Sequence, residues 1–213
     1  MNLKQTFCAS LKPLCSLGIA VALTGCASSG VRNPSGVPVT QMSADERGFV
    51  AGTGVESQDI VTVTDKMARQ ILATPEIAQA QGTPRIVLLP VENNTRFPIN
   101  KDLFLTRIRA QLNSKAAGKV RFLARDRIAA LEQERALKQS GQVTSNSDPN
   151  VQEFKGADFF LTGKLEGHST RTGQGQSDYI LYTFQLIDPR TSDIVFEDFH
   201  EIKKQGLEDA SYR

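Results

Sequence analysis

Tryptophan is absent from this 213-residue sequence, and cysteine and histidine are rare. The three cysteines, Cys8, Cys15 and Cys26, all precede Ala27, so the rest of the chain has no thiol for a disulfide or a thiolate zinc site. The two histidines, His168 and His200, are too few for a recognisable zinc site. With 11 Phe and 3 Tyr, the core is expected to be largely aliphatic.

An excess of one charge is also missing. The first 25 residues contain Lys4 and Lys12 and no acid, so 23 basic and 23 acidic residues remain after them. A neutral chain gains little affinity from counterion release, so nucleic acid is not expected as a partner. The sequence has no GxSxG motif, P-loop or dinucleotide fingerprint. We therefore expect no enzyme, no cofactor, no metal and no small-molecule substrate.

The chain has no apolar run long enough to cross a membrane. Leu14 to Leu23 is about half of the roughly 20 residues that a spanning helix needs. A basic start, a short apolar run and small residues predict a signal peptide over residues 1–25.

The last residues of this segment, Leu23-Thr24-Gly25-Cys26, resemble a bacterial lipobox. That resemblance implies a lipidated Cys26, anchored by acyl chains such as palmitate. Each buried CH₂ contributes about 0.8 kcal/mol, so two or more chains hold a protein stably in a membrane. Ala27, rather than Asp, resembles the sorting signal for the outer membrane. The alternative is an ordinary cleaved signal with a chance cysteine.

Residues 26–57 are rich in Gly, Ser, Pro and Thr and have no apolar period. They predict a flexible tether before a globular domain at residues 58–213. A coil of roughly 30 residues spans about 30 Å on average, and roughly 100 Å when fully stretched. Alternatively, part of this segment packs as an extended arm, with Phe49 and Val50 as the best candidates.

Three helices are predicted in the domain. The first begins near Ser57, which can cap it, and "TPE" at residues 74–76 ends or breaks it. The second follows Asn100 as N-cap, and the third covers about 125–139. Their inward residues are expected to be Ile60, Val63, Met67 and Ile71 in the first, Leu105, Ile108 and Leu112 in the second, and Ile128 and Leu131 in the third.

Strands are predicted between and after these helices. The apolar run 85–91 is typical of an interior strand buried on both faces, and 119–124 is a second strand. Three alternating segments follow, joined by the glycine-rich loop 171–178 and the turn 189–192. In the second of them, Ile180, Tyr182, Phe184 and Leu186 are in phase. The predicted fold is α/β (α+β): a single small domain with a mixed sheet and flanking helices.

Several stretches resemble the peptidoglycan-synthase activator lipoprotein LpoB family, a penicillin-binding protein activator family. They are "VLLPVENNTRFPIN", "GADFFLTGKLEG" and "YTFQLIDPRTSDIVFED", and the resemblance covers about Asp59 to the end. It implies a fold similar to the TolB N-terminal domain. It also implies an outer-membrane lipoprotein facing the periplasm. Such a protein binds the regulatory domain of a bifunctional class A penicillin-binding protein and stimulates peptidoglycan synthesis, and with it cell wall biogenesis and cell shape.

Candidate partner-binding residues are Asn94, Arg96 and Phe97, in a loop between two predicted elements, and Arg171 in the hairpin loop. Arginine and aromatic residues often anchor interfaces. Alternatively, Asn93 and Asn94 cap turns, Phe97 tucks under the second helix, and the hairpin around Arg171 is a plain turn. The aspartates 158, 178, 188, 193 and 198 are expected at strand ends or on solvent faces, which makes a catalytic carboxylate pair a weak alternative.

Two other functions stay open from the sequence. The chain could be a structural or secretion accessory lipoprotein of the outer membrane, of the kind found in curli or flagellar assemblies. It could also be an envelope hydrolase or a ligand-binding lipoprotein, which the missing catalytic motifs disfavour. The best-known members of the resembled family have a longer, proline-rich tether. The tether of this chain would therefore reach a synthase in the inner membrane only if it is well extended.

Overall fold

The computed structural model describes residues 39, 41–48, 51–143 and 153–207. The chain divides into two units, Met1–Gln41 and Met42–Arg213, and every element below belongs to the second. The predicted signal peptide, Cys26, Phe49 and Val50 lie outside the described residues. Among the described residues, no helix is long and apolar enough to span a membrane.

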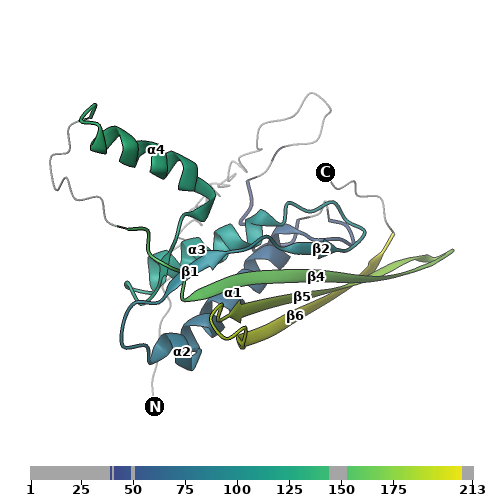
Figure 1. Ribbon diagram of the computed structural model, residues 1–213. Coiled ribbons are helices and arrows are strands. Elements are labelled where there is room, and N and C mark those ends of the chain that lie inside the picture. The colour runs from purple at the N-terminus through teal and green to yellow at the C-terminus, as the bar shows by residue number, and fades with distance from the viewer. Residues whose placement is uncertain (1–38, 40, 49–50, 144–152, 208–213) are drawn as a thin grey trace, which may run out of the picture. The chain divides into compact units, whose positions relative to one another are not determined.

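One mixed sheet organises the domain (Figure 1). Its order is β3-β1-β4-β5-β6, and β2 pairs with β4 beyond the end of β1. The strands are β1 (Arg85–Leu88), β2 (Glu92–Asn94), β3 (Arg121–Phe122), β4 (Phe159–Thr172), β5 (Gly175–Ile187) and β6 (Ile194–Gly206). The strands β1, β2 and β3 run parallel to their neighbours, whereas β4, β5 and β6 form an antiparallel meander.

The strand β1 is interior, as its apolar run predicts. Ile86 and Val87 point to opposite faces of the sheet and both are buried. Asp158 fixes where β1 meets β4: its carboxylate accepts the Arg85 N–H at 2.8 Å, and its own N–H donates to the Arg85 carbonyl at 2.8 Å. The residue before β4 therefore sets the register of a parallel pair.

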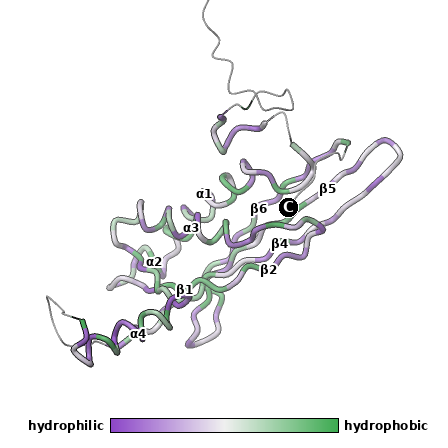
Figure 2. Tube along the Cα trace, turned by 90° about the horizontal axis from the view of Figure 1, so that it is seen from above, coloured by the Kyte–Doolittle hydropathy of each residue, from purple (hydrophilic) through white to green (hydrophobic). Residues whose placement is uncertain are grey.

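The meander has one buried and one exposed face. Even-numbered residues of β5, including Ile180, Tyr182, Phe184 and Leu186, are buried, as the alternation predicts. We call this the helix face, because α1 (Ser57–Ala73) and α3 (Asp102–Lys115) pack on it (Figure 2). The opposite, open face carries mostly polar residues such as Thr162, Lys164 and Gln185.

The core between the helices and the sheet is largely aliphatic. The predicted stripes are confirmed for α1 and α3: Val63, Met67, Ile71, Leu105, Ile108 and Leu112 are buried, and Ile60 is half-buried against the core. Phe104 of α3 contacts Tyr182 and Phe184, with ring centroids 5.7 and 6.1 Å apart. A short helix, α2 (Pro75–Ala78), follows the break at Thr74.

Both predicted N-caps were wrong by one residue. The N-cap of α1 is Glu56. Glu56 and Asp59 form a capping box, in which the side chain of each residue accepts a hydrogen bond from the backbone N–H of the other. The N-cap of α3 is Lys101, with no side-chain cap. Residues 52–54 are buried, so packing extends to the N-terminal side of Ser57.

Three further local predictions were wrong. Residues 92–94, expected in a loop, form β2 because they pair with β4. The expected loop 171–178 is mostly strand, and Thr172 already pairs with Gly175. The third helix, α4 (Ile128–Gln139), follows a 3-10 turn at Arg125–Arg127 and has no buried residue. Leu131, expected inward, is 42 % exposed, because α4 lies apart from the sheet (Figure 1).

Candidate functional site

The loop that carries Arg96 is held by its own side chains. The carboxamide oxygen of Asn93 accepts hydrogen bonds from the Thr95 N–H at 3.1 Å and the Thr95 hydroxyl at 2.8 Å. The Asn93 amide nitrogen donates to the Phe97 carbonyl at 2.8 Å. Asparagine stabilises such turns because its side chain reaches the backbone two residues on. This loop therefore presents Arg96 in a fixed position.

Arg96 forms a two-pronged ion pair with Asp178 of β5. Its Nε donates to Oδ1 at 3.0 Å and its Nη2 to Oδ2 at 2.8 Å. The Asp178 side chain is 1 % exposed and that of Arg96 is 36 % exposed. Bidentate arginine–carboxylate pairs are strong and directional. Asp178 thus fixes one edge of the guanidinium while part of the group still faces solvent.

Two neighbours complete what we call the Arg96 cluster: Ser169 on β4 and Gln176 on β5. The Ser169 hydroxyl donates to Asp178 Oδ1, and the Gln176 amide donates to both carboxylate oxygens at 3.3 and 3.1 Å. Burial opposes ionisation of Asp178, but the hydrogen bonds, led by that from Arg96, outweigh it and hold its pKa well below the usual range.

Phe97 packs between the Arg96 cluster and the core. It is 4 % exposed and belongs to the core, which agrees with the alternative that it tucks under the second helix. The Arg96 guanidinium lies over its ring, 4.1 Å from the centroid. Gly167 lets the loop approach β4, because a Cβ there would lie 3.2 Å from Thr95 Cα. Phe97 acts as a platform for Arg96 rather than as a free surface anchor.

The strand register brings Arg171 to the same side as Arg96. Arg171 pairs with Gln176, and Ser169 pairs with Asp178, so these side chains share the helix face. Lys204 of β6 pairs with Asp178 and joins them there. Its ammonium contacts Asp59 at 2.5 Å and the Gly54 carbonyl at 2.8 Å. Arg171 is exposed, and no hydrogen bond or ion pair of its side chain occurs within the described part of the chain.

Asn94 is placed differently from the other candidates. It pairs with Glu166, whose side chain is on the open face, so Asn94 is exposed on the opposite side of the sheet from Arg96. The structure therefore brings together Arg96, Phe97 and Arg171 and separates Asn94 from them.

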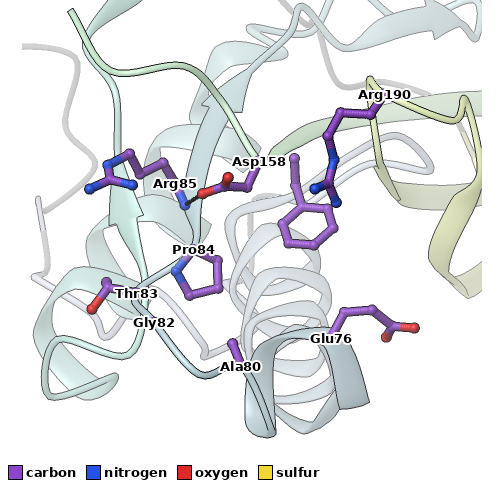
Figure 3. A pocket seen from close by; sticks show the side chains of 9 residues that line it. Glu76, Ala80, Gly82, Thr83, Pro84, Arg85, Asp158 and Arg190 are labelled. Carbon is purple, nitrogen blue, oxygen red and sulfur yellow. Dashed lines mark hydrogen bonds between the residues drawn. The ribbon is translucent and has the colours of Figure 1, made fainter.

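The other end of the sheet has a shallow pocket of about 330 Å³ (Figure 3). Asp158 and Arg190 lie on one side of it and Glu76 of α2 lies across from them, and Phe159 also lines the pocket. It thus joins the "GAD" and "IDPRTSD" stretches that carry the family resemblance. Because it is shallow, and its Asp158 and Arg190 already bond to Arg85 and Asp188, it gives no indication of a particular ligand.

The Arg190 side chain forms hydrogen bonds within its own turn, to Asp188. Its Nε and Nη2 donate to Asp188 at 3.0 and 2.6 Å, and its N–H donates to the same carboxylate at 2.9 Å. These hydrogen bonds hold the pKa of Asp188 at about 2. The group stabilises the β5–β6 connection, in which Ser192 has a positive φ of 65°.

Catalytic constellations are missing from the described residues. No group of three or more His, Cys, Asp or Glu residues there could hold a metal ion. His168 and Ser169 point to opposite faces of β4, as expected for neighbours in a strand. Asp178 was wrongly expected at a strand end or on a solvent face; it is buried, but its partners are an arginine and neutral side chains, not a second carboxylate.

A signal for Asp178 was present in the sequence. Gln176 and Asp178 continue the buried phase of Ile180 and Tyr182, and extending that phase by four residues predicts two buried polar side chains. What the sequence does not show is their partner, because Arg96 is 82 positions from Asp178.

These features define a domain of mixed α/β fold with a fixed arginine at one end of its sheet. Comparison with family models then identifies its family: the model described as peptidoglycan-synthase activator LpoB matches residues 59–202. This is more than half of the chain, so the chain belongs to that family, whose members are regulatory activators rather than enzymes.

Solved structures similar to this chain include two C-terminal domains of LpoB. That from Escherichia coli is 14 % identical with a TM-score of 0.40, and that from Salmonella enterica is 15 % identical with a TM-score of 0.39. Each match covers 68 % of this chain and 98 % of the other. Lipoprotein GNA1162 from Neisseria meningitidis is 13 % identical over 57 % of this chain and 83 % of the other, with a TM-score of 0.36. A comparison with curated proteins found no match.

Proposed function

We propose that this protein is an outer-membrane lipoprotein that binds a bifunctional class A penicillin-binding protein through its regulatory domain and thereby stimulates peptidoglycan synthesis. The observation that carries the proposal is the family match over residues 59–202. Activation by binding requires a difference in affinity between two states of the synthase.

In this proposal the lipid on Cys26 anchors the chain in the outer membrane, facing the periplasm, after removal of residues 1–25. The residues between Cys26 and the packed segment 52–54 then carry the domain toward the synthase. Because a tether of roughly 30 residues has a mean span of about 30 Å, a contact much farther away requires extension, which lowers the effective concentration of the domain.

The Arg96 cluster, with Arg171 beside it, is the proposed contact surface. Arg96 is held by Asp178 and by the ring of Phe97, so little side-chain entropy remains to be lost on binding. Arginine is among the residues most enriched in binding hot spots. Arg171 adds an exposed positive charge on the same face, which favours an acidic patch on the partner.

Arg171→Glu tests this surface without disturbing the buried pair. We expect its affinity for the matching synthase to fall at least about tenfold, since a like-charge contact replaces an attractive one. Calorimetry or biolayer interferometry with purified class A penicillin-binding proteins of the same bacterium measures it. Arg121→Glu, on β3 at the far edge of the sheet, is the control and should bind as wild type.

Unchanged binding by Arg171→Glu would remove this face from the proposal but leave the function standing. If no class A penicillin-binding protein binds the wild-type chain, the function itself is wrong. Self-association of the chain into rings in the same experiments would favour the structural or secretion accessory instead.

A further inference from the structure

A second pocket, of about 270 Å³, lies where the parallel strands β1 and β3 end. Ligands of open α/β sheets bind outside the carboxyl ends of the strands. Here the end of β1 supplies Leu88, Leu89 and Pro90, and the residues after β3 supply Leu123, Arg125 and Asp126. The N-terminal part of α3 supplies the remaining wall, with Asp102, Leu105, Thr106 and Arg109.

The pocket combines an aliphatic floor with charges of both signs. Leu105 is buried, and Leu88 and Leu123 are half-buried, so the floor belongs to the edge of the core. Arg109 and Arg125 provide two guanidinium groups, and Asp102 and Asp126 provide two carboxylates.

These charges do not neutralise one another. Within the described ranges, no hydrogen bond or ion pair involves the Arg109 side chain. Arg125 uses Nη2 to donate to the Lys155 carbonyl at 2.6 Å. Asp126 contacts Arg127, which does not line the pocket, at 3.4 Å. A half-buried arginine in a pocket, with its donors unused, can bind a carboxylate with two parallel hydrogen bonds.

We propose that this pocket binds a small zwitterion with an aliphatic side chain, an amino acid or dipeptide. Its carboxylate lies against Arg109 and Arg125, its ammonium against Asp126 or Asp102, and its side chain on Leu88, Leu105 and Leu123. The pocket volume of about 270 Å³ is just below that of sites for drug-sized molecules, about 300–1,000 Å³, which suits a small ligand. This site is separate from the proposed synthase contact and does not require it.

The test is a titration of the ¹⁵N-labelled chain from residue 27 onward with the dipeptide Ala-Leu, followed by NMR. We expect saturable shifts at Leu88, Leu89 and Leu123, with a Kd of about 1 mM or tighter, as ordinary ligand efficiency gives for a molecule of this size. N-acetyl-Ala-Leu and Ala-Leu amide each lack one charge and should bind at least about tenfold more weakly.

Arg109→Gln should weaken Ala-Leu binding at least about tenfold while its spectrum shows an intact fold. The control is Arg69→Gln, at an exposed position on α1 outside the pocket, which should bind Ala-Leu as wild type. Absence of saturable shifts at the pocket, equal binding of the capped dipeptides, or unchanged binding by Arg109→Gln would each overturn the proposal. Because no synthase is present, failure here does not bear on the proposed activator function.

Discussion

Arg96 and Asp178 are 82 positions apart in sequence and form a bidentate ion pair in the fold. Each residue type gives a clue by itself: the arginine precedes an aromatic residue in a polar loop, and the aspartate is in phase with a buried strand face. The contact between Arg96 and Asp178 requires β2 to lie beside β4. With three polar residues, β2 is too short and too polar to be predicted as a strand. The sequence can therefore indicate the members of such a cluster but not their contact.

Asp178→Asn should lower the free energy of unfolding at neutral pH by about 2–4 kcal/mol, since it breaks a buried ion pair. The folded-state pKa of Asp178 is lowered, so its ionised form stabilises the fold above the unfolded-state pKa of about 3.9. That contribution is lost as the pH falls below this value. The difference between wild type and variant should thus shrink below about pH 4 in urea denaturation at a series of pH values.

Asp193→Asn, at an exposed position in the β5–β6 turn, is the control and should stay close to wild type throughout. A difference for Asp178→Asn that is constant between about pH 6 and pH 2.5 would contradict the ionised pair.

At the scale of elements, β4 depends on glycine where the sheet meets the core. A Cβ on Gly163 would lie 2.7 Å from two ring atoms of Phe184 and 3.0 Å from the Thr183 carbonyl oxygen. Phe184 cannot move away easily, because it is fully buried and contacts Phe104. Gly163→Ala should therefore lower the free energy of unfolding by about 1–3 kcal/mol, as overpacking typically does.

Gly156→Ala is the matched control, since nothing lies within 4 Å of the Cβ it would add. Chemical denaturation should place this variant within about 0.5 kcal/mol of wild type. Equal stabilities of the two variants would show that the contact between β4 and Phe184 is looser than described.

The helix α4 is the element whose packing was predicted least well from the sequence. Its residues favour helix, and that prediction held, but Ile128 and Leu131 do not form a packed stripe. Helix propensity is local, whereas packing depends on the connections: α4 follows directly from a 3-10 turn after the two-residue strand β3. By contrast, α1 and α3 were predicted well because their stripes are long and regular.

Leu131→Ala should accordingly change the free energy of unfolding by less than about 0.5 kcal/mol. Leu112→Ala, in the fully buried stripe of α3, should cost about 2–5 kcal/mol. Thermal or urea unfolding compares the two. A large loss for Leu131→Ala would mean that α4 packs on the domain in solution.

At the scale of the whole molecule, the sheet ends in a long edge strand, β6, that is protected at its middle. The Lys66 ammonium donates to the Phe199 carbonyl at 2.5 Å, and the Asp198 carboxylate accepts the Phe199 N–H at 2.8 Å. Side chains thus occupy backbone groups that could otherwise pair with another strand. This protection disfavours the addition of another strand to β6 at Phe199.

The order of the elements and the mixed sheet were predictable, because long apolar stripes and alternating strands repeat along the sequence. The family was also recognisable, since its motifs follow one another over most of the domain. The proposed contact surface depends instead on pairings between distant residues, such as that of Arg96 with Asp178, and required the structure.

The most direct test of the activator function is the rate of lipid II polymerisation by purified class A penicillin-binding proteins, with and without the chain from residue 27 onward. The proposed function predicts faster glycan synthesis by one of these synthases and a reduced effect of Arg171→Glu. No change in rate with any of them, together with no detectable binding, would contradict it.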